Sequence, residues 1–325
     1  MTELRTAPIR DVGAPAPPTA AGPAPQPLPP VPRLDGRDPR YLALRNFAIS
    51  ISVLNILGYT VLGFEQPWAW PILTVLTAYA AEFGFETVAA WAERRRPGFT
   101  GHGVWGVYTF LLPTHITALA VNMLLYANDM FGAIAFGAIV AIGSKYVLRA
   151  PIKGRMRHFM NPSNFGITIT LLAFSSWVSI APPYEFTENV PDLFRLFIPL
   201  VIISAGTLLN AALTKKIPLI VGWVGGFVIQ ALVRHYVWDA PLWTGLTVMT
   251  GVAFVLFTNY MITDPGTTPS SGRNQFMFGG SVAAVYGVLM LFNVVYTLFF
   301  AVTIVCLARG LYWWGLDFTR RERHS

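Results

Sequence analysis

Residues 130–166 read MFGAIAFGAIVAIGSKYVL, then RAPIKGRMRHFM, then NPSNFG. The first part, residues 130–148, is apolar and long enough to cross the hydrocarbon core of a bilayer as a helix. A backbone surrounded by lipid must satisfy its hydrogen bonds within its own segment, so this stretch is expected to be helical. The basic residues that follow it are expected to stay on the cytoplasmic side of the membrane.

The same pattern recurs along the chain and predicts an all-α polytopic integral membrane protein with about ten transmembrane helices. The predicted spans are residues 46–64, 69–91, 104–126, 130–148, 162–180, 193–213, 218–234, 242–261, 278–292 and 294–314. The ninth is short, and only Asn293 separates it from the tenth. It could therefore be a re-entrant or strongly tilted segment rather than a full crossing.

The basic residues are distributed asymmetrically between the two sides of these spans. With both termini in the cytoplasm, all of the 23 Lys and Arg residues except Arg195 and Arg234 fall on the cytoplasmic side, which predicts the orientation. The far side carries Glu65, Asp129, Glu185, Glu188, Asp192 and Asp239. The net charge of +7 then reflects topology in the cell (inner) membrane and attraction to anionic lipid, and does not indicate nucleic-acid binding.

Composition divides the chain into three parts. Residues 1–40 are rich in Pro and Ala with no apolar face to bury, which predicts a disordered cytoplasmic tail. Residues 41–318 are the predicted transmembrane domain, and residues 319–325 are a basic cytoplasmic tail. The one cysteine, Cys306, lies in the last span, where it can form no intrachain disulfide and cannot hold a metal alone.

The loop after the fourth span carries the first informative motif. Lys145, Arg149 and His158 precede Asn161 and Pro162, which predict a helix start. Asn is a good N-cap acceptor, and Pro suits the first helical position because its missing N–H would have no partner there. The dipole and free N–H groups at such an end favour an anion. Two interpretations stay open: an ordinary positive-inside loop before a well-capped helix, or a site for a phosphate or an electron-rich ring.

The second motif ends the eighth span and reads Thr263-Asp264-Pro265-Gly266-Thr267. Pro and Gly stop a helix, and the neighbouring hydroxyl and carboxylate groups can satisfy its exposed backbone. Both motifs are predicted on the cytoplasmic side. Irregular backbone at membrane depth is tolerated only where protein or water covers it, so the two motifs are expected to converge on one cavity.

These two motifs resemble elements of the NqrB/RnfD family, the membrane subunits of sodium-pumping NADH:quinone reductase and Rnf complexes. The stretch from Thr263 to Pro265 resembles the A-T-D-P-x-[TS] element of that family, and the Asn161-Pro162 stretch resembles its F-N-P-A element. The motif H-x-x-N-P-S-N-F-G more closely resembles that of a divergent branch, the UnbU-like proteins encoded beside enediyne biosynthesis genes. The resemblance, from about residue 41 to 318, implies two five-helix halves, flavin-mediated electron transport coupled to Na⁺ or H⁺ movement, and other membrane or redox subunits as partners.

The family's covalent flavin site is not matched. The family carries FMN on the Thr of an S-G-A-T motif, whereas residues 181–191 read APPYEFTENVP and Thr187 has no small neighbours. The resemblance therefore leaves covalent FMN doubtful and a noncovalent FMN or riboflavin open. The residues that would hold it are Lys145, Arg149, His158, Asn161, Ser163, Asn164, Thr263, Asp264 and Thr267.

Three ionisable residues fall inside predicted spans. Glu82 and Glu86 are four positions apart and share one helix face, and His115 lies in the third span. Ionisable residues at membrane depth are costly and typically functional, which makes these three candidates for an ion pathway. The alternative is structural: water or Arg94 pairs with Glu86 near the helix end, and His115 is a core histidine bonded to a neighbouring helix.

Three functions follow for comparison. The first is a membrane subunit of an electron-transport complex, which binds flavin and couples electron transfer to cation movement. The second is a cofactor-free transporter or channel, and the third is a scaffold in an enediyne-type biosynthetic assembly. The chain shows no nicotinamide fingerprint, iron–sulfur cysteine set or haem motif, so any redox enzyme would need partner subunits.

Overall fold

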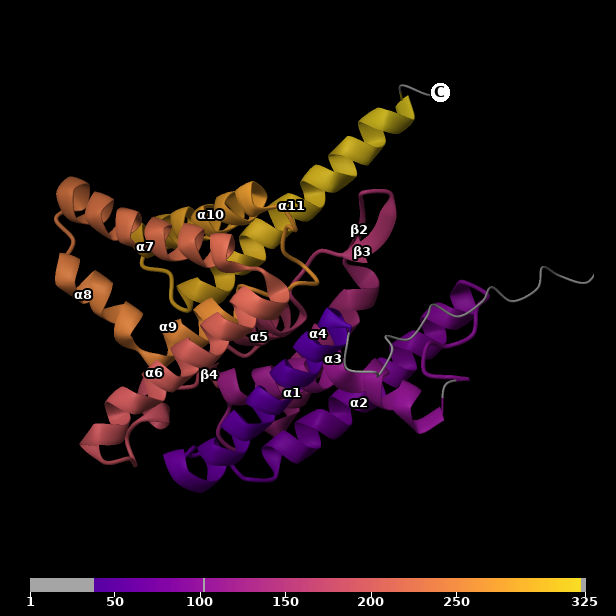
Figure 1. Ribbon diagram of the computed structural model, residues 1–325, viewed down its shortest axis with the longest axis horizontal. Helices are drawn as coiled ribbons and strands as arrows, with labels where there is room; N and C mark the ends of the chain where they lie inside the picture. Colours follow the sequence, from indigo (N-terminus) through magenta and orange to yellow (C-terminus); the bar gives the residue numbers. More distant parts are fainter. Residues whose placement is uncertain (1–37, 102, 323–325) are drawn as a thin grey trace, which may run out of the picture.

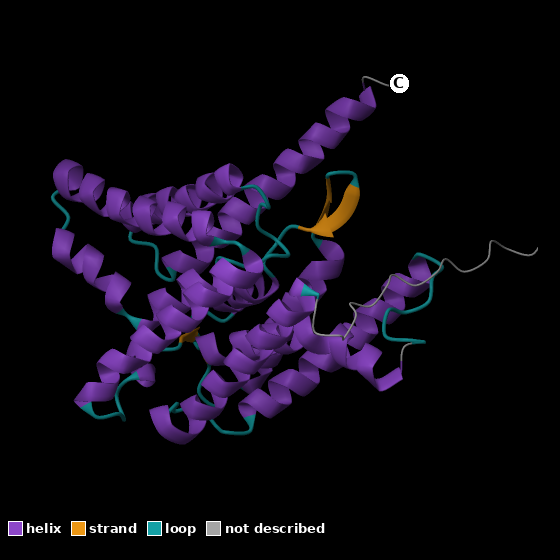
Figure 2. Cartoon of the chain, in the orientation of Figure 1, coloured by secondary structure: helices purple, strands orange, loops and turns teal. Residues whose placement is uncertain are grey.

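A computed structural model describes residues 38–101 and 103–322 of the chain (Figures 1 and 2). Residues 1–37 of the predicted tail and the last three residues of the basic tail lie outside this described part. The helices are α1 (Pro39–Leu57), α2 (Trp70–Ala92), α3 (Gly103–Leu124), α4 (Phe131–Val147), α5 (Pro162–Ala173), α6 (Asp192–Leu209), α7 (Ile217–Trp238), α8 (Leu242–Thr247), α9 (Val252–Leu256), α10 (Gly272–Leu291) and α11 (Thr297–Glu322). The short helical turns are η1 (Gly58–Leu62), η2 (Pro183–Phe186), η3 (Asn210–Thr214), η4 (Val248–Thr250) and η5 (Phe257–Met261).

The described chain is mostly helical, as predicted, and many of its helices suit a bilayer. Seven helices are long and apolar enough to cross a membrane. They are Pro39–Leu62, Trp70–Ala92, Gly103–Leu124, Asp192–Thr214, Ile217–Trp238, Gly272–Leu291 and Thr297–Glu322. The predicted ninth span is among them, because its helix begins six residues earlier than the apolar pattern alone indicated. A multi-pass membrane protein is therefore the fold class of this chain.

Three of the ten predicted spans are not single helices of membrane-spanning length. Helix α4, in the predicted span 130–148, has 17 residues. Helix α5 has 12 residues, because the helix in the predicted span 162–180 ends at Ala173. The predicted span 242–261 is broken at Gly251, where the two pieces are bent by 65°, and it gives an eighth crossing only if both pieces count as one. Hydropathy measures the length of an apolar run, and it does not register a break within that run.

Four short strands form two antiparallel pairs that the all-α expectation did not include. Strands β2 (Arg149–Ile152) and β3 (Arg155–His158) make a hairpin in which Arg149 pairs with His158. Strands β1 (Leu125–Tyr126) and β4 (Ser179–Ile180) pair next to the C-terminal end of α3. The basic loop predicted after the fourth span is therefore an ordered hairpin, which Figure 2 shows beside α11.

The helices pack in the same order in the two halves of the chain. In the first half, α1 packs on α3, and α2 packs on α3 and α4. In the second half, α6 packs on α9, and α7 lies along α10 (Figure 1). Helix α11 crosses back to contact α5 and β2, and so joins the two halves.

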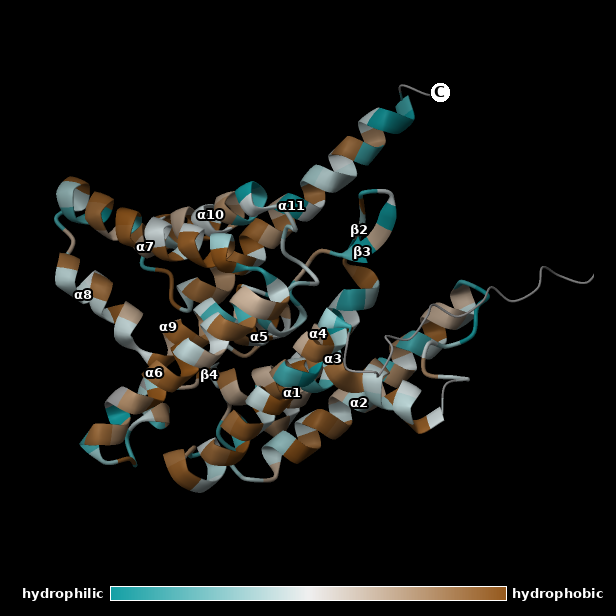
Figure 3. Ribbon diagram, in the orientation of Figure 1, coloured by the Kyte–Doolittle hydropathy of each residue, from teal (hydrophilic) through white to brown (hydrophobic). Residues whose placement is uncertain are grey.

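The outer surface of the bundle is apolar. Large apolar side chains such as Ile56, Trp91, Leu208 and Val237 are exposed along the helices. Hydrophilic residues gather at the hairpin and the C-terminal end of α11 (Figure 3). An apolar belt of this extent, with polar ends, is typical of a protein whose surface contacts lipid.

Candidate functional site

The Asn-Pro and Asp-Pro motifs meet at one end of the bundle. Asn161 caps α5, as predicted, and its Oδ1 accepts a hydrogen bond from the backbone N–H of Asn164 at 3.1 Å. Its Nδ2 donates to the carbonyl oxygen of Met261 at 2.8 Å, two residues before Thr263. The side chain of Asn161 therefore ties the start of α5 directly to the end of the broken eighth segment.

Most polar groups of these two motifs have partners within the chain. Asn164 donates to the carbonyl oxygen of Phe299 at 2.9 Å, and Thr263 donates to the carbonyl oxygen of Asn259 at 2.7 Å. Asp264 accepts from the hydroxyl of Thr267 at 2.8 Å. The hydroxyl of Ser163 donates to Oδ1 of Asn161 at 3.0 Å. These bonds satisfy the irregular backbone and the caps.

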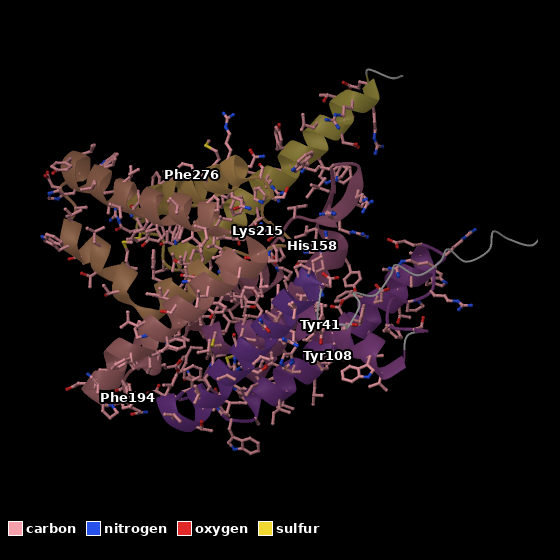
Figure 4. The ribbon with its side chains drawn as sticks, in the orientation of Figure 1. Tyr41, Tyr108, His158, Phe194, Lys215 and Phe276 are labelled. Atoms are coloured by element: carbon pink, nitrogen blue, oxygen red, sulfur yellow. The ribbon has the colours of Figure 1, made fainter. Side chains whose placement is uncertain are left out.

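His158 lies at the base of the hairpin, next to the Asp-Pro loop (Figure 4). A Cβ atom placed on Gly266 would lie 3.2 Å from its Nε2, so the ring is in van der Waals reach of that loop. Burial lowers the pKa of His158, and the Asp264 carboxylate opposes part of this shift. A neutral imidazole at this position is therefore favoured.

Two cations that the sequence did not single out lie against the same loop. Lys216 is buried and donates to the carbonyl oxygen of Pro269 at 2.7 Å, and Arg309 donates to the carbonyl oxygen of Thr267. Burial lowers the pKa of Lys216 to about 8, and the neighbouring Asp264 works in the opposite direction. Both cations therefore hold the loop's carbonyl groups in place.

The side chains of Lys145 and Arg149 have carboxylate partners outside the two motifs. Lys145 forms an ion pair with Glu82 of α2, and Arg149 forms one with Glu93 at 3.2 Å. The structure thus brings seven of the nine residues predicted for a cofactor into the two motifs. Lys145 and Arg149 pair with carboxylates at α2, yet both lie within electrostatic range of His158, and Arg149 is its partner in the hairpin.

The junction offers little room for a flavin. A cavity of about 80 Å³ lies between the halves, and Ser163 is the only one of the nine predicted residues that lines it. An apolar cavity of about 150 Å³ can take up a single benzene ring, and isoalloxazine has three fused rings. The other walls are mainly apolar and come from α1, α3, α9, η5 and α11. Eight of the nine predicted residues therefore lie outside the lining of this cavity.

Glu82 is the centre of a second cluster, between α2, α3 and α4. Its side chain is nearly fully buried, with 4% of the residue exposed. Beside the ion pair with Lys145, its carboxylate accepts hydrogen bonds from the hydroxyls of Thr114 and Tyr146, each at 2.8 Å. Both carboxylate oxygens thus have donors, and a buried charge is stable only when it is paired and hydrogen-bonded in this way.

Glu86 lies one helical turn further along the same face of α2. Its two carboxylate oxygens form a bidentate ion pair with the guanidinium nitrogens of Arg95, at 2.5 and 3.2 Å. One of these oxygens also accepts a hydrogen bond from the backbone N–H of Gly98 at 2.6 Å. The hydroxyl of Tyr146 lies 3.4 Å from Glu86 and so bridges it to Glu82. The cation at this helix end is Arg95, not the Arg94 considered from the sequence.

His115 belongs to a third group of polar side chains, nearer the middle of the bundle. Its Nε2 lies 2.9 Å from the hydroxyl of Ser52 on α1, and its Nδ1 lies 3.0 Å from the hydroxyl of Tyr79 on α2. Both ring nitrogens are therefore engaged, and three helices meet at this ring. His115 follows Thr114, the residue that bonds Glu82, so the two groups are contiguous along α3.

A fourth group continues toward the other end of the bundle. The Nδ2 of Asn122 donates to the hydroxyl of Tyr59 at 3.0 Å and to Oδ1 of Asn55 at 3.3 Å. Asn122 also accepts from Thr74 of α2 at 3.5 Å. The polar groups around Glu86, Glu82, His115 and Asn122 follow one another along α2 and α3, and we call them together the polar seam.

Sequence reasoning found three members of the polar seam and missed the rest. Hydroxyl and amide side chains such as Thr114 and Asn122 are common in transmembrane helices, so each one alone carries little signal. A comparison of how deep the polar residues lie in successive predicted spans would have revealed some of the missing members. Ser52, Tyr79 and His115 fall near the middle of three successive predicted spans, which is where one polar layer crosses them.

No group of three or more metal-ligating side chains exists among residues 38–101 and 103–322. No protein-family model matches the chain, and no match is found among curated proteins.

Proposed function

We propose that this chain is a membrane subunit of an electron-transport complex and that the first five helices of the chain carry cations across the cell membrane. The observation that supports this most is the buried Glu82 carboxylate, paired with Lys145 and bonded by two hydroxyls within a polar seam. Ionisable groups at membrane depth are costly and typically serve ion or proton movement. The other polar groups of the seam continue from Glu82 along α2 and α3, and together they would provide a route for the cation.

The resemblance to NqrB/RnfD proteins supports the redox part of the proposal. It implies ten crossings in two five-helix halves, and the distribution of basic residues favours both termini in the cytoplasm. The matching order of contacts, α2 with α4 and α7 with α10, favours such a division. Redox partners would then supply the electrons, because the chain carries no motif for nicotinamide, haem or iron–sulfur binding.

A cofactor-free transporter is the second candidate. The small cavity, and the intramolecular partners of Asn161, Asn164 and Asp264, favour it over a flavin-binding subunit. Absorbance of the purified protein separates the two. Flavin released by acid supports noncovalent binding, and fluorescence that stays with the protein on a denaturing gel shows covalent attachment. A colourless protein supports the transporter.

The cation route is tested in inverted membrane vesicles from cells that carry the gene in its own setting. Vesicles are energised with NADH, and uptake of H⁺ and Na⁺ is followed with dyes. We expect Glu82→Gln combined with Lys145→Gln to abolish the uptake that depends on this gene, because the pair is replaced by neutral groups of similar shape. Glu93→Gln is the control, since this carboxylate is exposed. Unchanged uptake in the double variant would overturn the proposal.

A further inference from the structure

Glu185 differs from the other buried carboxyls of the described chain. It lies in η2, only 1% of the residue is exposed, and neither of its oxygens has a hydrogen-bond partner among the described residues. Glu82 and Glu86, by contrast, are each held by a cation and by hydrogen-bond donors. A buried carboxylate without a partner is costly, so a group kept in this state is expected to exchange a proton.

The surroundings place Glu185 at the far end of the polar seam. Its neighbour Phe186 contacts Phe64 edge to face, with ring centroids 5.2 Å apart, and Phe64 contacts Tyr59 at 5.5 Å. Turn η2 packs against η1, which carries Tyr59. The Glu185 carboxyl and the Tyr59 hydroxyl lie within electrostatic range of each other. Tyr59 is the last member of the seam on this side.

The titratable groups that face Glu185 are carboxyls and phenols. Glu65 follows η1, and its carboxylate accepts a hydrogen bond from the hydroxyl of Tyr126 at 3.1 Å. Tyr184 and Glu188 lie on the same loop as Glu185. Burial raises the pKa of Glu185 to about 7. The nearby Glu65 carboxylate acts in the same direction. The Glu65 backbone N–H lies close enough to oppose part of the shift, although it does not reach the geometry of a hydrogen bond.

We propose that Glu185 is the proton-accepting group at the outer end of the polar seam, so that the cation carried by the first half is a proton. This inference rests on the proposed function and specifies its ion. In each transfer, one oxygen or nitrogen gives up a proton and the next accepts it. At the end, the Glu185 carboxylate binds the proton and then releases it to water outside.

The chemistry of the seam favours a proton over a sodium ion. The place a sodium ion would take at Glu82 is filled by the ammonium group of Lys145, which would repel it. The carboxyl, imidazole, phenol and alcohol groups along the seam can accept and donate protons, as at His115 between Ser52 and Tyr79. The amides of Asn55 and Asn122 orient the Tyr59 hydroxyl and carry no proton themselves.

The helix geometry gives the steps of this route. Ser52 and Asn55 are three residues apart on α1, a rise of about 4.5 Å. His115 and Asn122 are seven residues apart on α3, a rise of about 10 Å on the same face. Steps of this size exceed a single hydrogen bond, so water is required between the groups.

The experiment compares Glu185→Gln with Glu188→Gln in the NADH-energised vesicles, with H⁺ and Na⁺ followed separately. Glu188 is the matched control, because it lies on the same loop but is exposed. We expect H⁺ uptake to fall by about a hundredfold in Glu185→Gln and to be unchanged in Glu188→Gln. Infrared difference spectra of the purified full-length protein should show a carboxyl group that titrates near pH 7, and Glu185→Gln should remove it.

The outcomes separate this inference from the proposed function. Wild-type vesicles that take up Na⁺ but not H⁺ in a Glu82-dependent way would leave the proposed function standing and overturn the inference. Unchanged H⁺ uptake in Glu185→Gln, or no carboxyl titration near pH 7, would also overturn it. Gene-independent uptake of both ions would overturn the two together. Loss of uptake in Glu185→Gln with a normal thermal transition supports the role of Glu185, and Glu185→Asp should restore part of the uptake.

Discussion

The contact of α2 with α4 and the contact of α7 with α10 hold equivalent places in the two halves, yet they are built from different chemistry. The first is charged: Glu82 meets Lys145 in the interior. The second is apolar and closely packed. A Cβ on Gly279 would lie 2.3 Å from the carbonyl oxygen of Leu219, and a Cβ on Gly222 would lie 2.2 Å from that of Phe276, so the two backbones touch.

Aromatic packing joins the second contact to α9 and η5, because Trp223 of α7 also lies against Tyr286 of α10, with ring centroids 6.1 Å apart. Trp223 of α7 is fully buried and stacks on Phe254 at 5.6 Å. Its indole N–H donates to the hydroxyl of Thr258 at 2.9 Å, so its one polar group is satisfied. A dry contact of this kind resists movement and excludes water. Under the proposed function, this difference leads us to expect ion movement in the first half and a rigid supporting role in the second.

The largest expected effect breaks the charged contact. Lys145→Met leaves the Glu82 carboxylate buried without a cation, and this should lower the free energy of unfolding by about 3–5 kcal/mol. Thermal unfolding in detergent measures the loss. Adding Glu82→Gln removes the orphaned charge, so the double variant should recover most of the stability. If the single variant is as stable as the wild type, the pair does not hold the first half together.

The second-largest loss of stability is expected at the apolar contact of α7 with α10. Gly279→Ala places a methyl group against backbone atoms of α7 and should cost about 2–3 kcal/mol, because α7 and α10 must separate. Gly225→Ala is the matched control: nothing lies within 4 Å of a Cβ at this position of α7, so stability should not change. Equal thermal transitions for the two variants would contradict the close backbone contact.

A smaller effect concerns the pH dependence of stability. The pKa of Glu185 is about 7 in the folded chain and lower when unfolded, so the folded state binds the extra proton as pH falls. The free energy of unfolding should therefore decrease as pH rises from about 4.5 to 7. Glu185→Gln should be more stable than the wild type at pH 8, on the order of 1 kcal/mol, and equal to it at pH 4. A gain that is the same at both pH values would show that the carboxyl does not titrate in this window.

The smallest effect is expected at Glu93, at the exposed C-terminal end of α2. Glu93 pairs with Arg95 at 2.6 Å and with Arg149 at 3.2 Å, but its side chain is 47% exposed. Glu93→Gln should change the free energy of unfolding by less than about 1 kcal/mol. A larger loss would mean that the Arg149 contact holds the hairpin in place.

Hydropathy predicted much of this fold. Apolar runs located the helices, because backbone in lipid has no alternative to internal hydrogen bonds. The cap at Asn161 and Pro162 was also predicted, since capping depends on adjacent residues. The break at Gly251 was missed: it lies within a continuous apolar run, and its 65° bend depends on tertiary packing.

The candidate site was less predictable, because its partners are distant in sequence. Glu82 and Glu86 were found from their spacing on one helix face, but the Lys145 partner is 63 residues away. Lys145 was instead assigned to the Asn-Pro motif that follows it along the chain. Glu185 was seen only as an acidic residue of the outer side, since burial without a partner is a property of the folded loop.

The most direct measurement compares H⁺ uptake in the same energised vesicles for one variant from each contact. For the first contact, Glu82→Gln is combined with Lys145→Gln. For the second, Trp223→Phe removes the indole N–H while keeping an aromatic ring. We predict that uptake is lost in the first variant and retained in the second. Retained uptake in the first variant, or equal loss in two well-folded variants, would contradict the assignment of ion movement to the first half.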